Sequence, residues 1–237
     1  MNRNGWSSFW IETGPHIRQM FVASMTILVE HMAHGYVLPI LYLRTQNPIY
    51  YNMALYGEIA FLIYTSFLIG ASNQLKRDVT IEQMHPAVWP LLLTHHLSAL
   101  LLCTGCLMLG GDRIPKDLVC YVLLALLGFT SSLHYVGQIL DFSPLSQANA
   151  PYTRLGNHFF CLASQLFFRG VYWVKLLYLV MTHTLDAHGA GISMTVMLVM
   201  LLFTAFNIDF VKYHIKATRG CIRQISETKA KNAILYF

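Results

Sequence analysis

An apolar run of membrane-spanning length, from Trp89 to Leu109, contains two adjacent histidines. The run is WPLLLTHHLSALLLCTGCLML, and the pair is His95 and His96. A helix that crosses a bilayer needs about 20 consecutive apolar residues, so the run predicts a transmembrane helix. Ionisable side chains are costly in hydrocarbon and mark a functional site by default. The pair therefore indicates one of three roles: catalysis, contact with a lipid, or packing against neighbouring helices.

The whole chain has the composition of a membrane protein. Of its 237 residues, 55% are hydrophobic and only 11% are charged, whereas soluble domains carry about 25% charged residues. The net charge is +5, but the basic residues lie mostly beside apolar runs, as the positive-inside rule explains. We therefore exclude nucleic acid as a partner and expect one helical bundle without a separate soluble domain. The five cysteines, most of them in or beside apolar runs, argue against a disulfide framework.

Six apolar segments predict an all-α integral membrane protein, a bundle of six transmembrane helices. The predicted spans are residues 20–43, 53–71, 89–109, 118–140, 158–182 and 192–211. They form a transmembrane domain over residues 20–211, between an N-terminal arm at 1–19 and a basic C-terminal tail at 212–237. Aromatic residues share one face of the arm, which favours the membrane–water interface. Gly14-Pro15 predicts a helix start, because proline is favoured at the first helical position.

The connections and the basic residues determine the expected orientation. Two prolines among polar residues predict a polar connection over residues 143–157, and LDAHGAG at 185–191 predicts the loop before the last span. Lysines and arginines lie mostly at both termini and in the connections after the second and fourth spans. The side with more basic residues faces the cytosol or the mitochondrial matrix. We expect the endoplasmic reticulum or the mitochondrial inner membrane, with the first apolar run retained as its own targeting signal.

Acidic and basic groups lie inside the predicted spans. Glu30 and His34 are four residues apart, so they share a helix face and can share a proton or a hydrogen bond. The EHMAH sequence lacks the H-E-x-x-H order of zinc proteases, and we expect no metal. Arg169 is near the middle of its span, where it cannot easily snorkel to water. It needs a carboxylate, an array of carbonyls or a lipid headgroup, and a structural ion pair with Glu30 or Glu58 is an alternative.

The expected orientation places several polar side chains in the inner part of the bundle. We expect a histidine-rich layer there, with further polar groups deeper in the membrane. A cavity open to the inner face would keep these groups hydrated. The candidate residues for binding a lipid or its headgroup are His95, His96, His134, Arg169, Glu30 and His34.

Three segments occur in an order that resembles a known membrane domain. They are LLLTHHLSALLL with the histidine pair, LDFSPLSQANAPYTRLGN at the end of the fourth span, and FFCLASQLFFRGVYW in the fifth. The order is similar to that of the TLC family, the membrane domain shared by ceramide synthases, translocon-associated proteins and several lipid-regulating proteins. The resemblance covers residues 58–180. It implies a six-helix, barrel-like bundle around a long, lipid-accessible cavity that takes up an acyl chain.

The resemblance also implies residues for catalysis. Ceramide synthases transfer a fatty acyl group from coenzyme A to a sphingoid amine, and their paired histidines match His95 and His96. Ceramide synthases also carry the sequence His-Asp-x-x-Asp-x-x-Leu-Glu. In this chain the matching segment lacks both aspartates, because His134 and Gly137 occupy their positions. Only the last acidic residue is kept, as Asp141. A catalytic site would consist of His95, His96 and Asp141.

Three functions are open from the sequence. The missing aspartates favour the first, a non-catalytic, lipid-binding TLC-like membrane protein that is an accessory or structural subunit of a larger membrane complex. The second is an acyl-CoA-dependent N-acyltransferase that acts on a sphingoid base. The third, a histidine-bound metal oxidoreductase, would need histidine boxes that the chain lacks. We expect membrane lipids and neighbouring membrane-protein subunits as partners, a bound phospholipid or acyl lipid, no cofactor, and acyl-CoA only for an enzyme.

Overall fold

The apolar segments form helices throughout the part of the chain that the structure describes. This computed structural model describes residues 14–75, 88–109, 115–142 and 145–234. Within these ranges the helical residues form six continuous segments, three of which pass through a π-helical stretch (η). The segments are α2–η1–α3 (Pro15–Met32, Ala33–Val37, Leu38–Thr45), α4 (Pro48–Leu75), α6 (Val88–Leu109), α7–η2–α8 (Lys116–Leu123, Leu124–Ser131, Ser132–Phe142), α9–η3–α10 (Leu145–Ser164, Gln165–Tyr172, Trp173–His188) and α11 (Ala190–Ile234). The described chain is thus almost entirely helical, as predicted.

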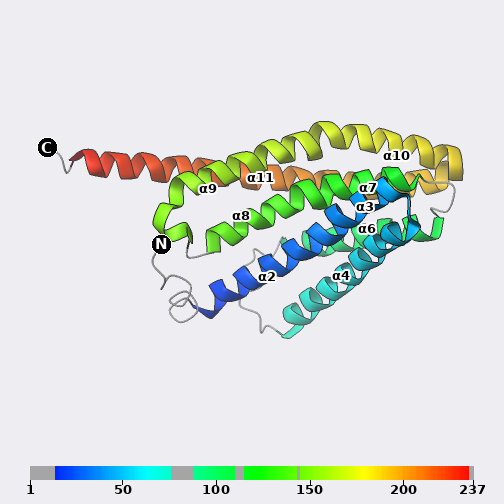
Figure 1. Ribbon diagram of the computed structural model, residues 1–237, viewed down its shortest axis with the longest axis horizontal. Coiled ribbons are helices and arrows are strands. Elements are labelled where there is room, and N and C mark those ends of the chain that lie inside the picture. Colours follow the sequence, from blue (N-terminus) through cyan, green and yellow to red (C-terminus); the bar gives the residue numbers. More distant parts are fainter. Residues whose placement is uncertain (1–13, 76–87, 110–114, 143–144, 235–237) are drawn as a thin grey trace.

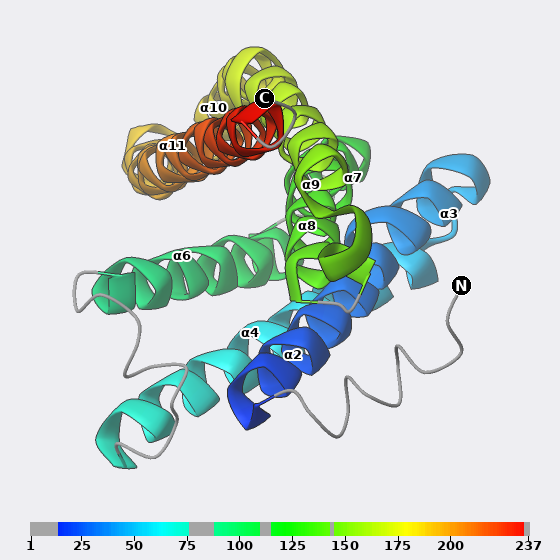
Figure 2. The ribbon, with the colours of Figure 1, turned by 90° about the vertical axis from the view of Figure 1, so that its left-hand side faces the viewer.

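The helices lie side by side along one long axis (Figure 1). α11 packs against α9 and α10, while α2 packs against α8 and α4 packs against α6. Viewed from one end, the α9–α11 group and the α2–α4 group lie on opposite sides, with α8 between them (Figure 2). The last turns of α11 extend beyond the other helices (Figure 1).

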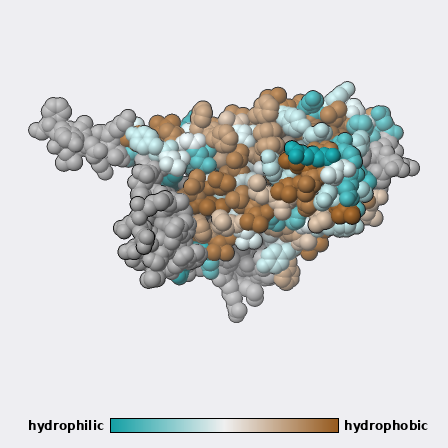
Figure 3. Space-filling model, viewed as in Figure 1, coloured by the Kyte–Doolittle hydropathy of each residue, from teal (hydrophilic) through white to brown (hydrophobic). Residues whose placement is uncertain are grey.

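The long apolar helices expose much of their apolar surface. By length and composition, three helices in the described ranges can cross a membrane: Ile17–Thr45, Lys116–Leu140 and Ala190–Glu227. In the most apolar windows of the first and third, only 22% and 24% of the residues are buried. Hydrophobic residues cover much of the middle of one face, and hydrophilic residues gather toward one end (Figure 3). Monomeric soluble proteins rarely expose large contiguous apolar patches, so this surface suits a bilayer.

Two connections predicted from the sequence are largely helical instead. Most of the predicted connection at 143–157 forms the first turns of α9, from Leu145 onward. A proline inside a helix costs about 3 kcal/mol, and the packing of α9 along both α8 and α11 offsets this cost at Pro151. The predicted loop at 185–191 is wrong except around Gly189, whose φ of 78° separates α10 from α11. This left-handed conformation favours glycine, which has no Cβ.

The two ends of the described chain also bear on the sequence predictions. α2 begins at Pro15 with Gly14 as its N-cap, as predicted. α11 continues without a break past residue 211, where the last span was expected to end, and reaches Ile234. Residues 1–13 of the predicted N-terminal arm lie outside the described residues.

The three π-helical stretches lie next to one another in the bundle. η2 packs against both η1 and η3. Gly35 in η1 allows its backbone to approach η2 closely, since a Cβ there would collide with Leu127 and with Gly128 N. π-Helical turns are wider than α-helical turns and often lie at functional sites. The polar groups around η2 are therefore the first place to search for a site.

Candidate functional site

Arg169 lies at the centre of a buried polar cluster. From η3 its guanidinium reaches η2 and α11, where Nε donates to Thr130 Oγ1 at 2.6 Å and Nη1 donates to Asn207 Oδ1 at 2.9 Å. Nη2 donates to Ser131 Oγ at 2.6 Å and to the Leu126 carbonyl at 3.1 Å. A buried charge needs such hydrogen bonds. All four acceptors are neutral. Of the three kinds of partner expected for Arg169, a carboxylate, an array of carbonyls or a lipid headgroup, this arrangement is closest to the array of carbonyls.

A chain of hydrogen bonds runs through His134 on α8. Ser24 Oγ on α2 donates to Gln138 Oε1 at 3.0 Å. Gln138 Nε2 then donates to His134 Nε2 at 3.0 Å, so His134 has its hydrogen on Nδ1. That Nδ1 lies 3.3 Å from His214 Nε2 on α11 and donates to it. His158 on α9 completes this histidine cluster, with its ring centroid 5.7 Å from that of His214.

The histidine pair on α6 points to two different neighbours. The His95 ring stacks on Phe206 of α11, with centroids 4.0 Å apart and planes 11° apart, and contacts Phe203 edge-on. His95 Nδ1 is buried and has no hydrogen-bond partner in the described chain. His96 Nδ1 lies 3.2 Å from Thr65 Oγ1 on α4. The two ring centroids are 5.8 Å apart, and each ring packs against a different helix.

Two carboxylates and two histidines meet between the first two helical segments. One Glu30 oxygen accepts a hydrogen bond from His34 Nδ1, and the other lies 2.9 Å from His31 Nδ1. The hydrogen bond predicted between Glu30 and His34 is confirmed. Gly57 on α4 leaves room for the His34 ring, since a Cβ there would collide with it. Glu58 is 3% exposed, and its Oε2 has no hydrogen-bond partner among the described residues.

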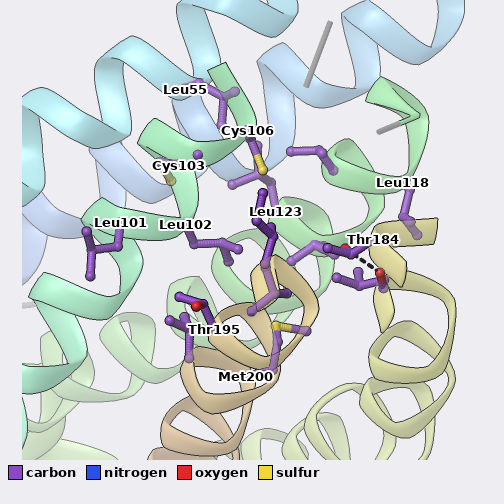
Figure 4. A pocket seen from close by; sticks show the side chains of 17 residues that line it. Leu55, Leu101, Leu102, Cys103, Cys106, Leu118, Leu123, Thr184, Thr195 and Met200 are labelled. Atoms are coloured by element: carbon purple, nitrogen blue, oxygen red, sulfur yellow. Dashed lines mark hydrogen bonds between the residues drawn. The ribbon is translucent and has the colours of Figure 1, made fainter. Parts of the chain in front are cut away.

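An apolar cavity of about 290 Å³ lies toward the C-terminal end of α6. α4, α6, α7, α10 and α11 form it, mostly with leucine, valine and methionine side chains (Figure 4). The Thr184 hydroxyl donates to the Val180 carbonyl at 2.7 Å, and the Thr195 hydroxyl donates to the Gly191 carbonyl at 3.3 Å. Both hydroxyls are therefore engaged with their own helices, and the cavity presents an apolar wall.

The lining of the cavity includes exposed residues of α6 and α11. Among its lining residues, Leu101 on α6 is 65% exposed, and Ile192 on α11 is also exposed. Leu102 and Cys103 line the cavity seven residues after the histidine pair, which is roughly 10 Å along the helix axis. Leu101, the lining residue of α6 nearest to the pair in sequence, follows His96 by five residues, so the pair lies roughly one and a half turns from the cavity.

The residues predicted to bind a headgroup are engaged in contacts within the protein. Arg169 and His134 form hydrogen bonds inside the protein, and the Glu30–His34 pair lies between the first two helical segments. None of these side chains lines the apolar cavity. Asp141 lies in the last turn of α8, and its side chain is outside the described part of the structure.

A buried stripe on α11 supplies two partners that the sequence analysis missed. Asn207 forms a hydrogen bond with Arg169, and His214 forms one with His134. Their positions follow a seven-residue spacing that places residues on one helix face. The buried members of this stripe are Ser193, Met200, Asn207, His214 and Cys221. Because the stripe mixes polar and apolar residues, average hydropathy does not reveal it. The seven-residue spacing, by contrast, could have identified these residues as one buried face.

Comparison of the chain with protein-family models, with curated proteins and with solved structures finds no match.

Proposed function

We propose that this chain is a TLC-like integral membrane protein that binds a lipid acyl chain without catalysing acyl transfer, as an accessory subunit of a larger membrane assembly. The observation that supports lipid binding best is the apolar cavity, whose lining includes exposed residues of α6 and α11. The exposed apolar helices support insertion into a membrane. In this proposal the chain crosses the membrane six times, with both termini in the cytosol or the mitochondrial matrix.

A hydrocarbon chain suits this cavity for physical reasons. Pockets for small molecules usually measure about 300–1,000 Å³, and this cavity, at about 290 Å³, lies at the lower end. An acyl chain gains little hydrophobic free energy on leaving the bilayer, because lipid tails are as apolar as leucine. An empty cavity, however, leaves its walls without dispersion contacts. An acyl chain that enters the cavity restores these contacts.

Two contacts favour a role without catalysis. Gly137 stands where the TLC pattern has its second aspartate, and the Asn157 amide lies against it, so a side chain there would have to displace that amide. The His95 ring lies flat on Phe206 instead of facing a carboxylate. A catalytic histidine is normally oriented by such a third group. The arrangement therefore supports a packing role for the pair more than general-base catalysis.

Filling the cavity tests the proposed lipid site. Gly105 lines the cavity, and a Cβ there would meet no atom within 4 Å, so the ring of Gly105→Phe can enter the space without moving the backbone. We expect native mass spectrometry of the purified protein to show a co-purified lipid in the wild type. In Gly105→Phe the bound fraction should fall at least about tenfold, which corresponds to 1.4 kcal/mol.

The matched control is Gly220→Phe on α11. A Cβ at Gly220 would also meet no atom within 4 Å, and this residue does not line the cavity. Equal amounts of lipid in the two variants would contradict binding in the cavity.

Catalysis is tested separately, with labelled acyl-CoA and a sphingoid base added to the purified wild type. We expect no N-acylated product under conditions in which a ceramide synthase is active. Turnover that His95→Ala abolishes would contradict the non-catalytic role and favour the N-acyltransferase.

A further inference from the structure

A second candidate site lies between the first two helical segments, and its Glu58 follows the cavity residue Leu55 by three residues on α4. Glu30, His31 and Glu58 each offer one ligand atom, and these atoms lie within 4.8 Å of one another. We propose that these three side chains bind a divalent transition-metal ion of the Zn²⁺ type inside the helix bundle. This proposal does not depend on lipid binding by the cavity.

The donor set matches this class of ion. Zn²⁺ binds imidazole nitrogen and carboxylate oxygen at about 2.0–2.2 Å. Two donors at that distance around one tetrahedral ion stand roughly 3.4 Å apart, so small side-chain rotations would bring the three atoms into range. Ca²⁺ takes about six to eight oxygen ligands, and imidazole favours zinc and its neighbours in the transition series. One nitrogen and two carboxylates therefore point to a transition metal.

The Glu58 carboxylate is an independent indication of a ligand. Its side chain comes from α4, is 3% exposed, and directs Oε2 into a position where no described residue forms a hydrogen bond with it. Burying a carboxylate without a partner is costly. A bound cation would supply the missing partner of Glu58 Oε2, and the two positive charges would also balance the carboxylate of Glu30.

His34 is a positioning residue for this site. It donates through Nδ1 to one oxygen of Glu30, and its ring occupies the space that Gly57 leaves on α4. Groups that orient metal ligands in this way contribute strongly, and their loss typically costs about 10–100-fold in metal affinity. His34 thus holds the Glu30 carboxylate in the orientation that the metal requires.

The test is the metal content of the full-length protein, purified in detergent without a polyhistidine tag. We expect close to one equivalent of zinc or another divalent transition metal in the wild type. Glu58→Gln and Glu30→Gln should each lose most of this metal, because glutamine keeps the size of glutamate but removes its charge. His34→Ala should weaken zinc binding by about 10–100-fold in competition with a chelator.

The control is Glu227→Gln, which changes an exposed carboxylate on α11 that pairs with Arg223. This variant should keep the metal content of the wild type. Helix content measured by circular dichroism identifies variants that fail to fold. Independently of any variant, Co²⁺ added to the metal-depleted wild type should give the visible absorption of a tetrahedral site. A wild type that binds neither zinc nor Co²⁺, or a folded Glu58→Gln protein with unchanged metal content, would overturn the proposal.

Discussion

Replacing Thr130 by valine removes one acceptor from the buried guanidinium of Arg169 while keeping the shape of the side chain. Arg169 Nε donates to Thr130 Oγ1 at 2.6 Å, and both side chains are buried. A hydrogen bond to a charged group contributes about 1.5–3 kcal/mol. The Leu126 carbonyl, which accepts from the Thr130 hydroxyl, keeps its hydrogen bond from Arg169 Nη2 in the variant. We therefore expect Thr130→Val to lower the free energy of unfolding by about 1.5–3 kcal/mol.

Thermal unfolding in micelles of fixed detergent and lipid composition measures this effect. For a protein of this length the expected loss corresponds to a decrease of about 3–12 °C in the unfolding midpoint. Thr26→Val is the matched control, because the Thr26 hydroxyl is exposed and donates only to the Val22 carbonyl of its own helix. If both variants unfold within about 0.5 kcal/mol of each other, the Thr130 hydroxyl does not help to hold the charge of Arg169, and the other three acceptors hold it without Thr130.

Two further substitutions test neighbouring contacts in the same assay. Asn207→Asp places a carboxylate opposite Arg169 Nη1 and removes Asn207 Nδ2, which is buried without a hydrogen-bond partner among the described residues. It should raise the free energy of unfolding by about 1–3 kcal/mol, whereas Asn52→Asp, at an exposed position of α4, should change it little. A destabilised Asn207→Asp protein would contradict this account of the Arg169 charge. Gly57→Ala puts a methyl group into the His34 ring and should cost about 1–3 kcal/mol, while Gly220→Ala, in open space on a helix, should gain about 0.5–1 kcal/mol. Equal stabilities of these two alanine variants would show that His34 is not held against Gly57.

Features that depend on neighbouring positions along one helix were predictable from the sequence. The start of α2 at Pro15 follows from the fixed φ of proline. The hydrogen bond between Glu30 and His34 follows from their four-residue spacing. The long apolar runs likewise predicted the helical class. Each of these signals lies within a few residues of the structure that it predicts.

Features that depend on packing between helices were not predictable in the same way. The polar residues of 143–157 favour a connection by local propensity, yet residues from Leu145 onward are helical because α9 packs between α8 and α11. The partners of Arg169 come from η2 and α11, which no spacing within the fifth span reveals. The placement of the apolar cavity also depends on how five helices meet.

Each π-helical stretch joins two α-helices and sets how far the second is rotated about the common axis relative to the first. An α-helix turns about 100° per residue, so deleting one residue from η2 would rotate α8 by about that angle relative to α7. Leu123 would still line the cavity, but His134 would turn away from His214. The same reasoning applies to η3, which separates His158 from the cavity residue Thr184. A change in the number of residues between these positions would therefore break these contacts even if every residue kept its identity.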